Sequence, residues 1–226
     1  MSTPLIPKSP LVRTSLWFIF IAFGCLFFAD IEITTQDPWP EMKKLGMGLI
    51  QPNFSKWRQI LEALMMTLAF AILGVALANL TGFLLAVIFH FRAVRVGCAF
   101  VRAVHELFWA LIFLQIFGLT ALTGVLAIAI PYSGICAKVY AELLEEADSA
   151  PVRAIPGGTS VVSLFFYGKL PGVWANVKTY SFYRLECGLR SSAVLGFVGL
   201  PTLGFYLETA YKEGLYSDLS ALLIVF

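Results

Sequence analysis

Charged side chains are scarce in this sequence. Only 13% of its 226 residues are Asp, Glu, Lys or Arg, and 59% are hydrophobic, whereas a soluble domain has roughly 25% charged and 45–50% apolar residues. A water-soluble globular fold is therefore excluded. The charges nearly balance, at a formal net charge of +2, so neither a basic nucleic-acid binder nor an acidic interaction tail is indicated.

Motifs for metal or nucleotide binding are also missing. The cysteines, Cys25, Cys98, Cys136 and Cys187, lie far apart in apolar runs without CxxC or Cys/His spacing, which argues against a metal site or a disulfide framework. No GxxxxGK[ST] pattern occurs, and the PGGTS run that begins at Pro156 has no following Lys to reach a phosphate. We therefore expect this chain to bind no metal and no cofactor.

Long apolar runs dominate the rest of the sequence. A helix of about 20 mostly apolar residues crosses the hydrocarbon layer of a membrane. Runs of this kind cover residues 15–29, 60–91, 96–117, 119–139 and 177–198, and a last one covers 219–226. As a helix, residues 220–226 of this last run reach only about 10 Å. We predict an all-α polytopic membrane helix bundle with about five complete spans and a truncated sixth.

Basic residues set the predicted orientation, because cytoplasmic loops are enriched in Lys and Arg. With the amino terminus inside, nine Lys and Arg residues fall in cytoplasmic segments and five fall outside, while Arg184 and Arg190 lie within the fifth run. Residues 1–14 then form a cytoplasmic segment and 15–226 a single transmembrane domain, with an extracytoplasmic loop at about 30–58 and a cytoplasmic loop at about 142–171.

The cytoplasmic loop, residues 142–171, is much longer than a simple helix connection. Its start is acidic, as at Glu145. Asp148 or Ser149 can cap a short helix that the Pro156-Gly157-Gly158 run would end. We predict that this short helix lies across the cytoplasmic face and moves as a rigid lever; a passive amphipathic connector is the alternative.

The spacing of residues in this loop resembles a known pattern. Permease subunits of binding-protein-dependent ABC importers carry, in their longest cytoplasmic loop, EAA, three residues, Gly, nine residues, Ile, any residue and Leu-Pro. Gly158 and the Leu170-Pro171 pair match this pattern. The EAA positions hold Val152, Arg153 and Ala154, and Gly168 replaces the Ile.

Other segments extend the resemblance. Residues 179–205, with a Tyr-Arg-x-Glu-x-x-x-Arg core, are similar to the fifth span of the phosphonate-type (PhnE-like) permeases, and so are residues 102–113 and 137–152. The chain thus resembles a phosphonate-type permease subunit with the fold of a type I ABC importer permease.

This resemblance implies a function and a set of partners. Two permease copies would pair in the bacterial inner membrane among lipids, and separate cytoplasmic ATPase subunits would hydrolyse ATP. A periplasmic phosphonate-binding protein would deliver phosphonate or a related small phosphorus oxyanion, such as phosphite or a phosphate ester. The permease itself would have no catalytic residues. The loop residues that would couple it to the ATPase are Glu145, Asp148, Arg153, Gly158, Leu170 and Pro171.

Charged residues interrupt the fifth apolar run at Arg184, Glu186 and Arg190. A charge at membrane depth costs about 2.5–3.5 kcal/mol on insertion scales and normally faces protein or water. Glu186 and Arg190, four residues apart, are predicted to pair on one helix face, and Arg184 is expected to pair with Glu106 or His105. These residues either line the translocation pathway, where a guanidinium group suits an anionic substrate, or form buried ion pairs that fix helix registry.

Two other functions remain open from the sequence. A membrane-embedded enzyme acting on lipid or peptide would need a Ser-His or paired-acid constellation. His105 and Glu106 are the one hint, and we expect them to point apart because neighbouring helical residues are about 100° apart. A truncated, non-functional permease is the other alternative, because the last span is short and the EAA residues are altered.

Overall fold

The computed structural model describes residues 10–28, 38–147, 155, 159–160 and 163–226. It divides into two compact units, residues 1–43 and 44–226. The first contains α1 (Pro10–Phe28), an apolar helix, and the start of α2 (Pro38–Ile50). The large apolar side chains described in α1 are exposed within the unit, as at Trp17 and Phe20, which suits a helix surrounded by lipid.

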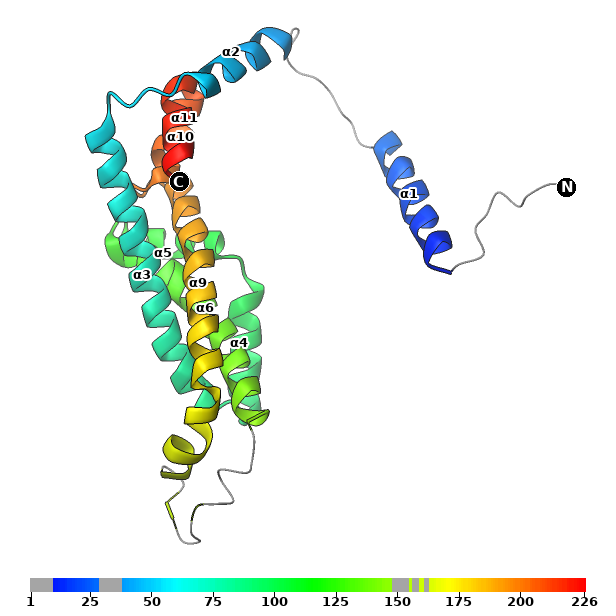
Figure 1. The fold of residues 1–226 in the computed structure, drawn as a ribbon, viewed down its shortest axis with the longest axis vertical. Coiled ribbons are helices and arrows are strands. Elements are labelled where there is room, and N and C mark those ends of the chain that lie inside the picture. Colours follow the sequence, from blue (N-terminus) through cyan, green and yellow to red (C-terminus); the bar gives the residue numbers. More distant parts are fainter. Residues whose placement is uncertain (1–9, 29–37, 148–154, 156–158, 161–162) are drawn as a thin grey trace, which may run out of the picture. The chain divides into compact units, whose positions relative to one another are not determined.

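The second unit is a bundle of helices. Its long members α3, α6 and α9 contact one another and run side by side along the length of the bundle (Figure 1). In chain order the elements are α3 (Trp57–Val87), α4 (Arg92–Ala103), α5 (Glu106–Phe117), α6 (Ala121–Glu145), the π-helical turn η1 (Leu164–Lys169), α9 (Leu170–Val194), the 3₁₀ turn η2 (Leu195–Val198), α10 (Leu203–Lys212) and α11 (Tyr216–Val225). The predicted all-α fold is confirmed for the described residues.

Among the described residues, two helices, α3 and α6, are each long and apolar enough to cross a membrane. Two bent pairs raise this number to four if each pair counts as one span: α4 with α5, bent by 92°, and 164–198 with α10, bent by 50°. Helices α1 and α11 are shorter apolar helices. The chain is therefore a membrane protein, and its described residues contain fewer straight spans than the five complete ones predicted.

The predicted third span, residues 96–117, is wrong as a continuous helix. The chain leaves the helical conformation at Val104 (φ −93°, ψ 126°) and His105 (φ −64°, ψ 144°). The His105 side chain then caps α5 by accepting a hydrogen bond from the Leu107 N–H. A polar pair inside an apolar run here marks the start of a new helix.

The boundary between loop and fifth span differs from the prediction, which placed the loop at 142–171 and the span at 177–198. Helix α6 continues to Glu145, and helical structure resumes at Leu164 and runs on into α9. Pro171 lies in the first turn of α9, directly after the π-helical turn η1. The helical structure of the fifth span therefore begins before Pro171, inside the predicted loop.

Small residues let α3 and α6 approach closely. An added Cβ at Gly82 would lie 2.6 Å from the Cys136 Cβ, and one at Gly74 would lie 2.9 Å from the Ile128 Cβ. Ala78 is fully buried on the same side of α3. Close approach of this kind is typical of helices that pack within membranes.

A buried hydrogen bond joins α3 to the end of the bundle that contains α10 and α11, beside the hydrophobic cluster that also links these helices. The Leu203 N–H, at the start of α10, donates to the Thr67 Oγ1 over 2.9 Å. The neighbouring chain is tightly packed, because an added Cβ at Gly204 would lie 1.9 Å from the Ala193 carbonyl oxygen. Both contacts hold α10 against the bundle after the chain turns at η2.

Candidate functional site

Arg184 lies inside the bundle among aromatic side chains. Its Nε and Nη2 donate to the Tyr180 hydroxyl over 2.8 and 2.7 Å. Its guanidinium carbon lies 5.4 Å from the ring centroid of Tyr132, 5.1 Å from that of Tyr180 and 5.6 Å from that of Tyr183. Cation–π contacts of this kind stabilise a desolvated cation without neutralising it.

The Tyr132 hydroxyl continues the polar contacts toward Glu106. It lies 2.8 Å from the Ser191 Oγ, which donates to the Glu106 Oε1 over 2.6 Å. A serine hydroxyl carries one proton, so the Tyr132 hydroxyl donates to Ser191 when Ser191 donates to Glu106. The carboxylate is therefore connected to the ring beneath Arg184 through two hydroxyl groups.

A second set of hydrogen bonds joins α3, α6 and α9 deeper along the bundle. The Tyr140 hydroxyl donates to the Asn79 Oδ1 over 2.8 Å and lies 2.8 Å from the Ser181 Oγ. The rings of Tyr140 and Tyr180 meet edge to face, with centroids 6.0 Å apart. Together these residues and those around Arg184 form what we call the polar network: Asn79, Tyr132, Tyr140, Tyr180, Ser181, Arg184, Ser191 and Glu106.

The predicted partners of the intramembrane charges are wrong. Arg184 binds Tyr180 and three aromatic faces, and within the described residues it forms no ion pair with Glu106 or His105. Glu186 and Arg190 are both exposed on α9 and form no ion pair with each other. The spacing of four residues permits a pair between opposite charges, but Glu186 and Arg190 do not form it here, whereas Lys138 and Glu142 do.

His105 and Glu106 lie closer than predicted. The His105 Nε2 is 4.0 Å from the Glu106 Oε1, since His105 is the extended residue that caps α5 and not a helical residue. The imidazole Nδ1 already accepts the Leu107 N–H. His105 and Glu106 therefore belong to the break between α4 and α5.

The residues predicted to couple to an ATPase are placed only in part. Glu145 is exposed in the last turn of α6. Leu170 begins α9 and is half-buried, and Pro171 follows it as an exposed residue. Asp148, Arg153 and Gly158 lie outside the described residues, as does the predicted short helix.

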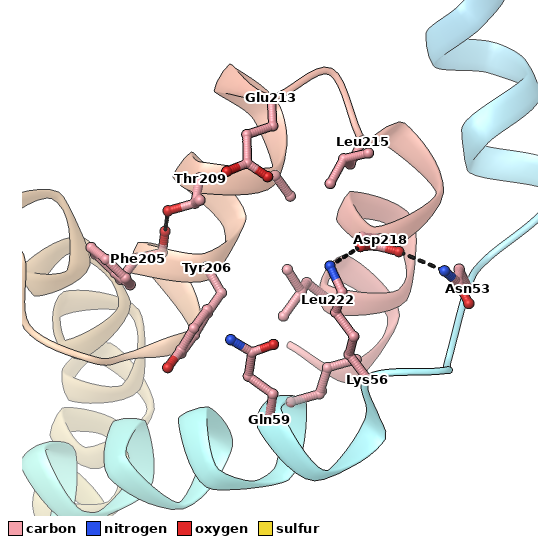
Figure 2. Close-up of a pocket in the computed structure, with 12 residues that line it drawn as sticks. Asn53, Lys56, Gln59, Phe205, Tyr206, Thr209, Glu213, Leu215, Asp218 and Leu222 are labelled. Atoms are coloured by element: carbon pink, nitrogen blue, oxygen red, sulfur yellow. Dashed lines mark hydrogen bonds and ion pairs between the residues drawn. The ribbon is translucent and has the colours of Figure 1, made fainter.

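A polar cavity lies at the opposite end of the bundle from Glu145. It has a volume of about 330 Å³ and lies between the start of α3, α10 and α11 (Figure 2). The Lys56 Nζ donates to the Asp218 Oδ2 over 2.9 Å, and the Asn53 Nδ2 donates to the Asp218 Oδ1 over 2.8 Å. Gln59 and Glu213 add an amide and a second carboxylate to the lining.

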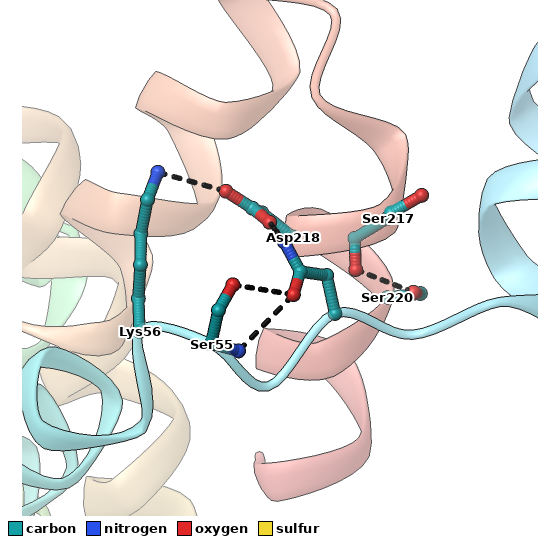
Figure 3. Close-up of polar contacts among 6 residues, drawn as sticks. Ser55, Lys56, Ser217, Asp218 and Ser220 are labelled. Carbon is teal, nitrogen blue, oxygen red and sulfur yellow. Dashed lines mark hydrogen bonds and ion pairs between the residues drawn. The ribbon is translucent and has the colours of Figure 1, made fainter.

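The segment before α3 is held against α11 by these contacts. The Asn53 N–H also donates to the Ser217 carbonyl oxygen over 2.9 Å, and the Asn53 Oδ1 accepts from Ser55. Figure 3 shows the Lys56 and Ser55 contacts with the start of α11 beside them. The hydrogen bond and the charge of Asp218 raise the pKa of the Lys56 ammonium, which stays protonated at neutral pH.

Several functional candidates were not predicted from the sequence. Nothing in the sequence distinguishes four of them from ordinary members of apolar spans: Tyr132, Tyr140, Tyr180 and Ser191. Asn79 gave a signal, since it is an amide in the middle of the apolar run 60–91, and polar residues at membrane depth are often functional. Within the described residues, no group of three or more His, Cys, Asp or Glu side chains could hold a metal ion.

Comparison with known proteins places the chain among transport proteins. No family model matches it. It is 29% identical to the phosphite transport system permease protein PtxC of Stutzerimonas stutzeri over 224 residues, which cover 94% of this chain and 82% of that protein. It is 32% identical to a cryptic phosphonate transport system permease protein, PhnE2, of Escherichia coli (strain K12), over 44% of this chain and 83% of that protein.

A solved structure supports the fold. The crystal structure of an amino acid ABC transporter with histidines matches with a TM-score of 0.64 at 18% identity, covering 75% of this chain and 86% of that one. At this identity the likeness shows the fold alone, which is that of an ABC transporter permease. From the identity and coverage of its relatives, the chain belongs to the phosphonate-type permease subunits of ABC importers.

Proposed function

We propose that the chain is the membrane-spanning subunit that moves phosphonate, or a related small phosphorus oxyanion such as phosphite or a phosphate ester, into the cytoplasm. Its relatives are named as phosphite and phosphonate permeases. The observation that carries the substrate class is Arg184, a half-buried guanidinium that binds a phenol and aromatic faces. Since no carboxylate neutralises it among the described residues, its charge is available to an anion.

The geometry of a guanidinium group suits this substrate class. Its planar fork of N–H donors matches the oxygens of phosphate-like groups. The Tyr180 hydroxyl occupies Nε and Nη2, which leaves Nη1 and the second Nη2 proton for a passing anion. Because the Arg184 guanidinium also interacts with aromatic rings, its attraction for the anion is weak enough for the anion to leave again, as transport requires.

The exposed charges of α9 support a homodimer. Glu186 and Arg190 face outward from a single chain at membrane depth, where contact with lipid is costly. A second permease copy, with a water-filled pathway between the two, would cover them. In this arrangement Arg184, Glu186, Arg190 and Glu106 lie along or beside the pathway.

The two ends of the bundle would serve different partners. With the amino terminus inside, Glu145, Leu170 and Pro171 lie at the cytoplasmic end, where a separate ATPase subunit docks and hydrolyses ATP for this chain. The polar cavity at Lys56 and Asp218 then faces the periplasm and a phosphonate-binding protein. The location would be the bacterial inner membrane.

Reconstituted transport tests this proposal. The chain, its ATPase and its binding protein are placed in proteoliposomes, and ATP-dependent uptake of methylphosphonate, phosphite and a neutral sugar is measured. We expect uptake of the phosphorus oxyanions only. Arg184→Gln should reduce that uptake about tenfold or more, the effect of losing one charged contact, while Arg95→Gln, at an exposed residue of α4, should not.

Two results would contradict the proposal. Normal uptake by an assembled Arg184→Gln variant at low substrate concentration would remove Arg184 from the pathway. Uptake of a neutral or cationic solute in place of the oxyanions would show that the substrate class is wrong.

A further inference from the structure

A second, largely apolar cavity lies at the other end of the bundle. It has a volume of about 500 Å³ and opens between the end of α3, the end of α6 and η1. Its walls include Phe83, Leu84, Val87, Leu144 and Phe165. The ring centroids of Phe83 and Phe165, two lining residues, lie 6.2 Å apart and link α3 to η1.

Apolar side chains continue from this cavity onto the outer surface. Leu84 is 61% exposed, Val87 48% and Phe166 52%. An exposed apolar surface of this kind marks contact with lipid or with another protein. Helix α3 ends at Val87, and the apolar run 60–91 ends directly before the charged Arg92, the first residue of α4. The cavity therefore lies where the hydrocarbon layer meets the headgroups.

The rim of the cavity carries charges of both signs. His90, Glu145 and Lys169 belong to its lining, and both Glu145 and Lys169 are exposed. They form no ion pair with each other within the described residues, whereas Lys138 and Glu142, one turn back along α6, do pair over 3.3 Å. The rim thus presents a cation and an anion that are both free to meet a ligand.

We propose that this cavity binds a phospholipid with a phosphoethanolamine headgroup. One acyl chain occupies the apolar cavity, the phosphate accepts hydrogen bonds from Lys169 and His90, and the primary ammonium donates to Glu145. Basic pockets at the cytoplasmic ends of membrane helices are known sites for lipid headgroups. Here the acidic residue at the rim selects the headgroup further.

The charge pattern discriminates among common phospholipids. The trimethylammonium of a choline headgroup has no N–H, so it cannot donate a hydrogen bond to Glu145. An anionic glycerol headgroup brings no cation and places its phosphate beside the Glu145 carboxylate, which repels it. Only a primary ammonium satisfies the carboxylate and the phosphate partners together.

Lipid retention tests the proposal without depending on which solute is transported. The full chain is reconstituted in nanodiscs of equal parts phosphatidylethanolamine, phosphatidylcholine and phosphatidylglycerol, and the lipids retained after extraction into detergent are measured by native mass spectrometry. We expect phosphatidylethanolamine to be enriched about tenfold, the effect of one charge-assisted hydrogen bond.

Matched variants separate the two rim charges. Glu145→Gln should remove the preference for phosphatidylethanolamine over phosphatidylcholine, and Lys169→Gln should reduce the retention of all three lipids. The controls are Glu146→Gln and Lys178→Gln, which alter exposed residues outside this cavity and should behave as the unaltered chain does.

A photoreactive phosphatidylethanolamine gives a second measurement on the unaltered chain. Its acyl chain should label peptides that contain residues 83–90 and 165–169. Equal retention of the three lipids, enrichment of phosphatidylglycerol, or labelling confined to other helices would overturn the proposal. Loss of the bound lipid when the ATPase is added would show that the partner protein, and not a lipid, occupies the cavity.

Discussion

Arg184 and Glu106 are connected through Tyr132 and do not form an ion pair. The guanidinium lies over the Tyr132 ring, 5.4 Å from its centroid, and the Tyr132 hydroxyl reaches Glu106 through Ser191. A direct pair would cancel the positive charge of Arg184 and hold both side chains rigidly. The observed arrangement stabilises the cation while leaving its charge in place.

The link through Ser191 should contribute to stability as a unit. Ser191→Ala leaves the Tyr132 hydroxyl and the Glu106 carboxylate without their shared partner, at an expected cost of about 1–3 kcal/mol in the free energy of unfolding. Tyr132→Phe removes the other end of the link but keeps the ring beneath Arg184. Since both changes break the same link, the double variant should lose less than the sum of the two, as measured by thermal unfolding in detergent. Additive losses would show that the two hydrogen bonds are independent.

The Tyr180 hydroxyl should position Arg184 for transport. Tyr180→Phe removes both hydrogen bonds from the guanidinium, so we expect uptake to fall about tenfold through a higher KM with assembly unchanged. Tyr183→Phe is the matched control, because the Tyr183 ring contacts Arg184 while its hydroxyl forms no hydrogen bond among the described residues. Equal effects of the two changes would assign no special role to the Tyr180 hydroxyl.

The contact between Thr67 and Leu203 should fix the start of α10. Thr67→Val keeps the shape of the side chain but leaves the buried Leu203 N–H without an acceptor, which costs about 1–3 kcal/mol of unfolding free energy. Thr67→Ser retains the hydroxyl and should recover most of this loss. Hydrogen exchange at the Leu203 amide should rise in the valine variant alone. Unchanged exchange there would mean that another group satisfies the amide.

Gly204 should tolerate no side chain. Its Cβ would lie 1.9 Å from the Ala193 carbonyl oxygen, and backbone atoms cannot move aside without shifting η2. Gly204→Ala should therefore lower stability by about 1–3 kcal/mol or prevent assembly. Gly97→Ala, where an added Cβ meets nothing within 4 Å, should be neutral or stabilising because alanine favours a helix. Yields and melting temperatures of the two variants in detergent check this difference.

The Lys56 contact should be insensitive to pH near neutrality. The pKa of Lys56 is raised in the folded chain by Asp218, so the contact stabilises the fold fully below the ordinary lysine pKa of about 10.4. Its contribution is lost as the pH rises through the higher folded value. Protection of the Asn53 amide from hydrogen exchange, corrected for the intrinsic rate, should therefore stay constant from pH 7 to 9 (about three units to one unit below that pKa). In Lys56→Met the protection should already be lower at pH 7. A decline between pH 7 and 9 in the unaltered chain would contradict this assignment.

Hydropathy predicted most of the helices but not their breaks. Runs of apolar residues locate α3, α6 and α9 well, since burial in lipid demands a helix wherever the chain is apolar. The 92° bend between α4 and α5 depends on local capping by His105, which a window of mean hydropathy averages away. The helical turn that begins at Leu164 was missed because residues 142–171 were predicted to form a loop.

The sequence predicted which charged residues belong to the candidate site, but not which residues they contact. Arg184 and Glu106 stand out as charges in apolar runs, and both belong to the polar network. Their actual partners are tyrosines and a serine, which interrupt no hydropathy pattern and could be identified only once α6 was placed against α9. The pairing of Glu186 with Arg190 was inferred from spacing alone, which permits an ion pair but does not require one.

The extended backbone at Val104 and His105 has a consequence for the isolated chain. The His105 carbonyl oxygen still accepts from the Phe108 N–H, but a helix break removes part of the regular backbone hydrogen bonds, and hydrocarbon offers no replacement for them. Where α4 and α5 cross as one bent span, this corner must be sheltered by another polypeptide or by trapped water. A single subunit alone in the bilayer would then lack this shelter, so its stability in the membrane depends on the partners with which it assembles.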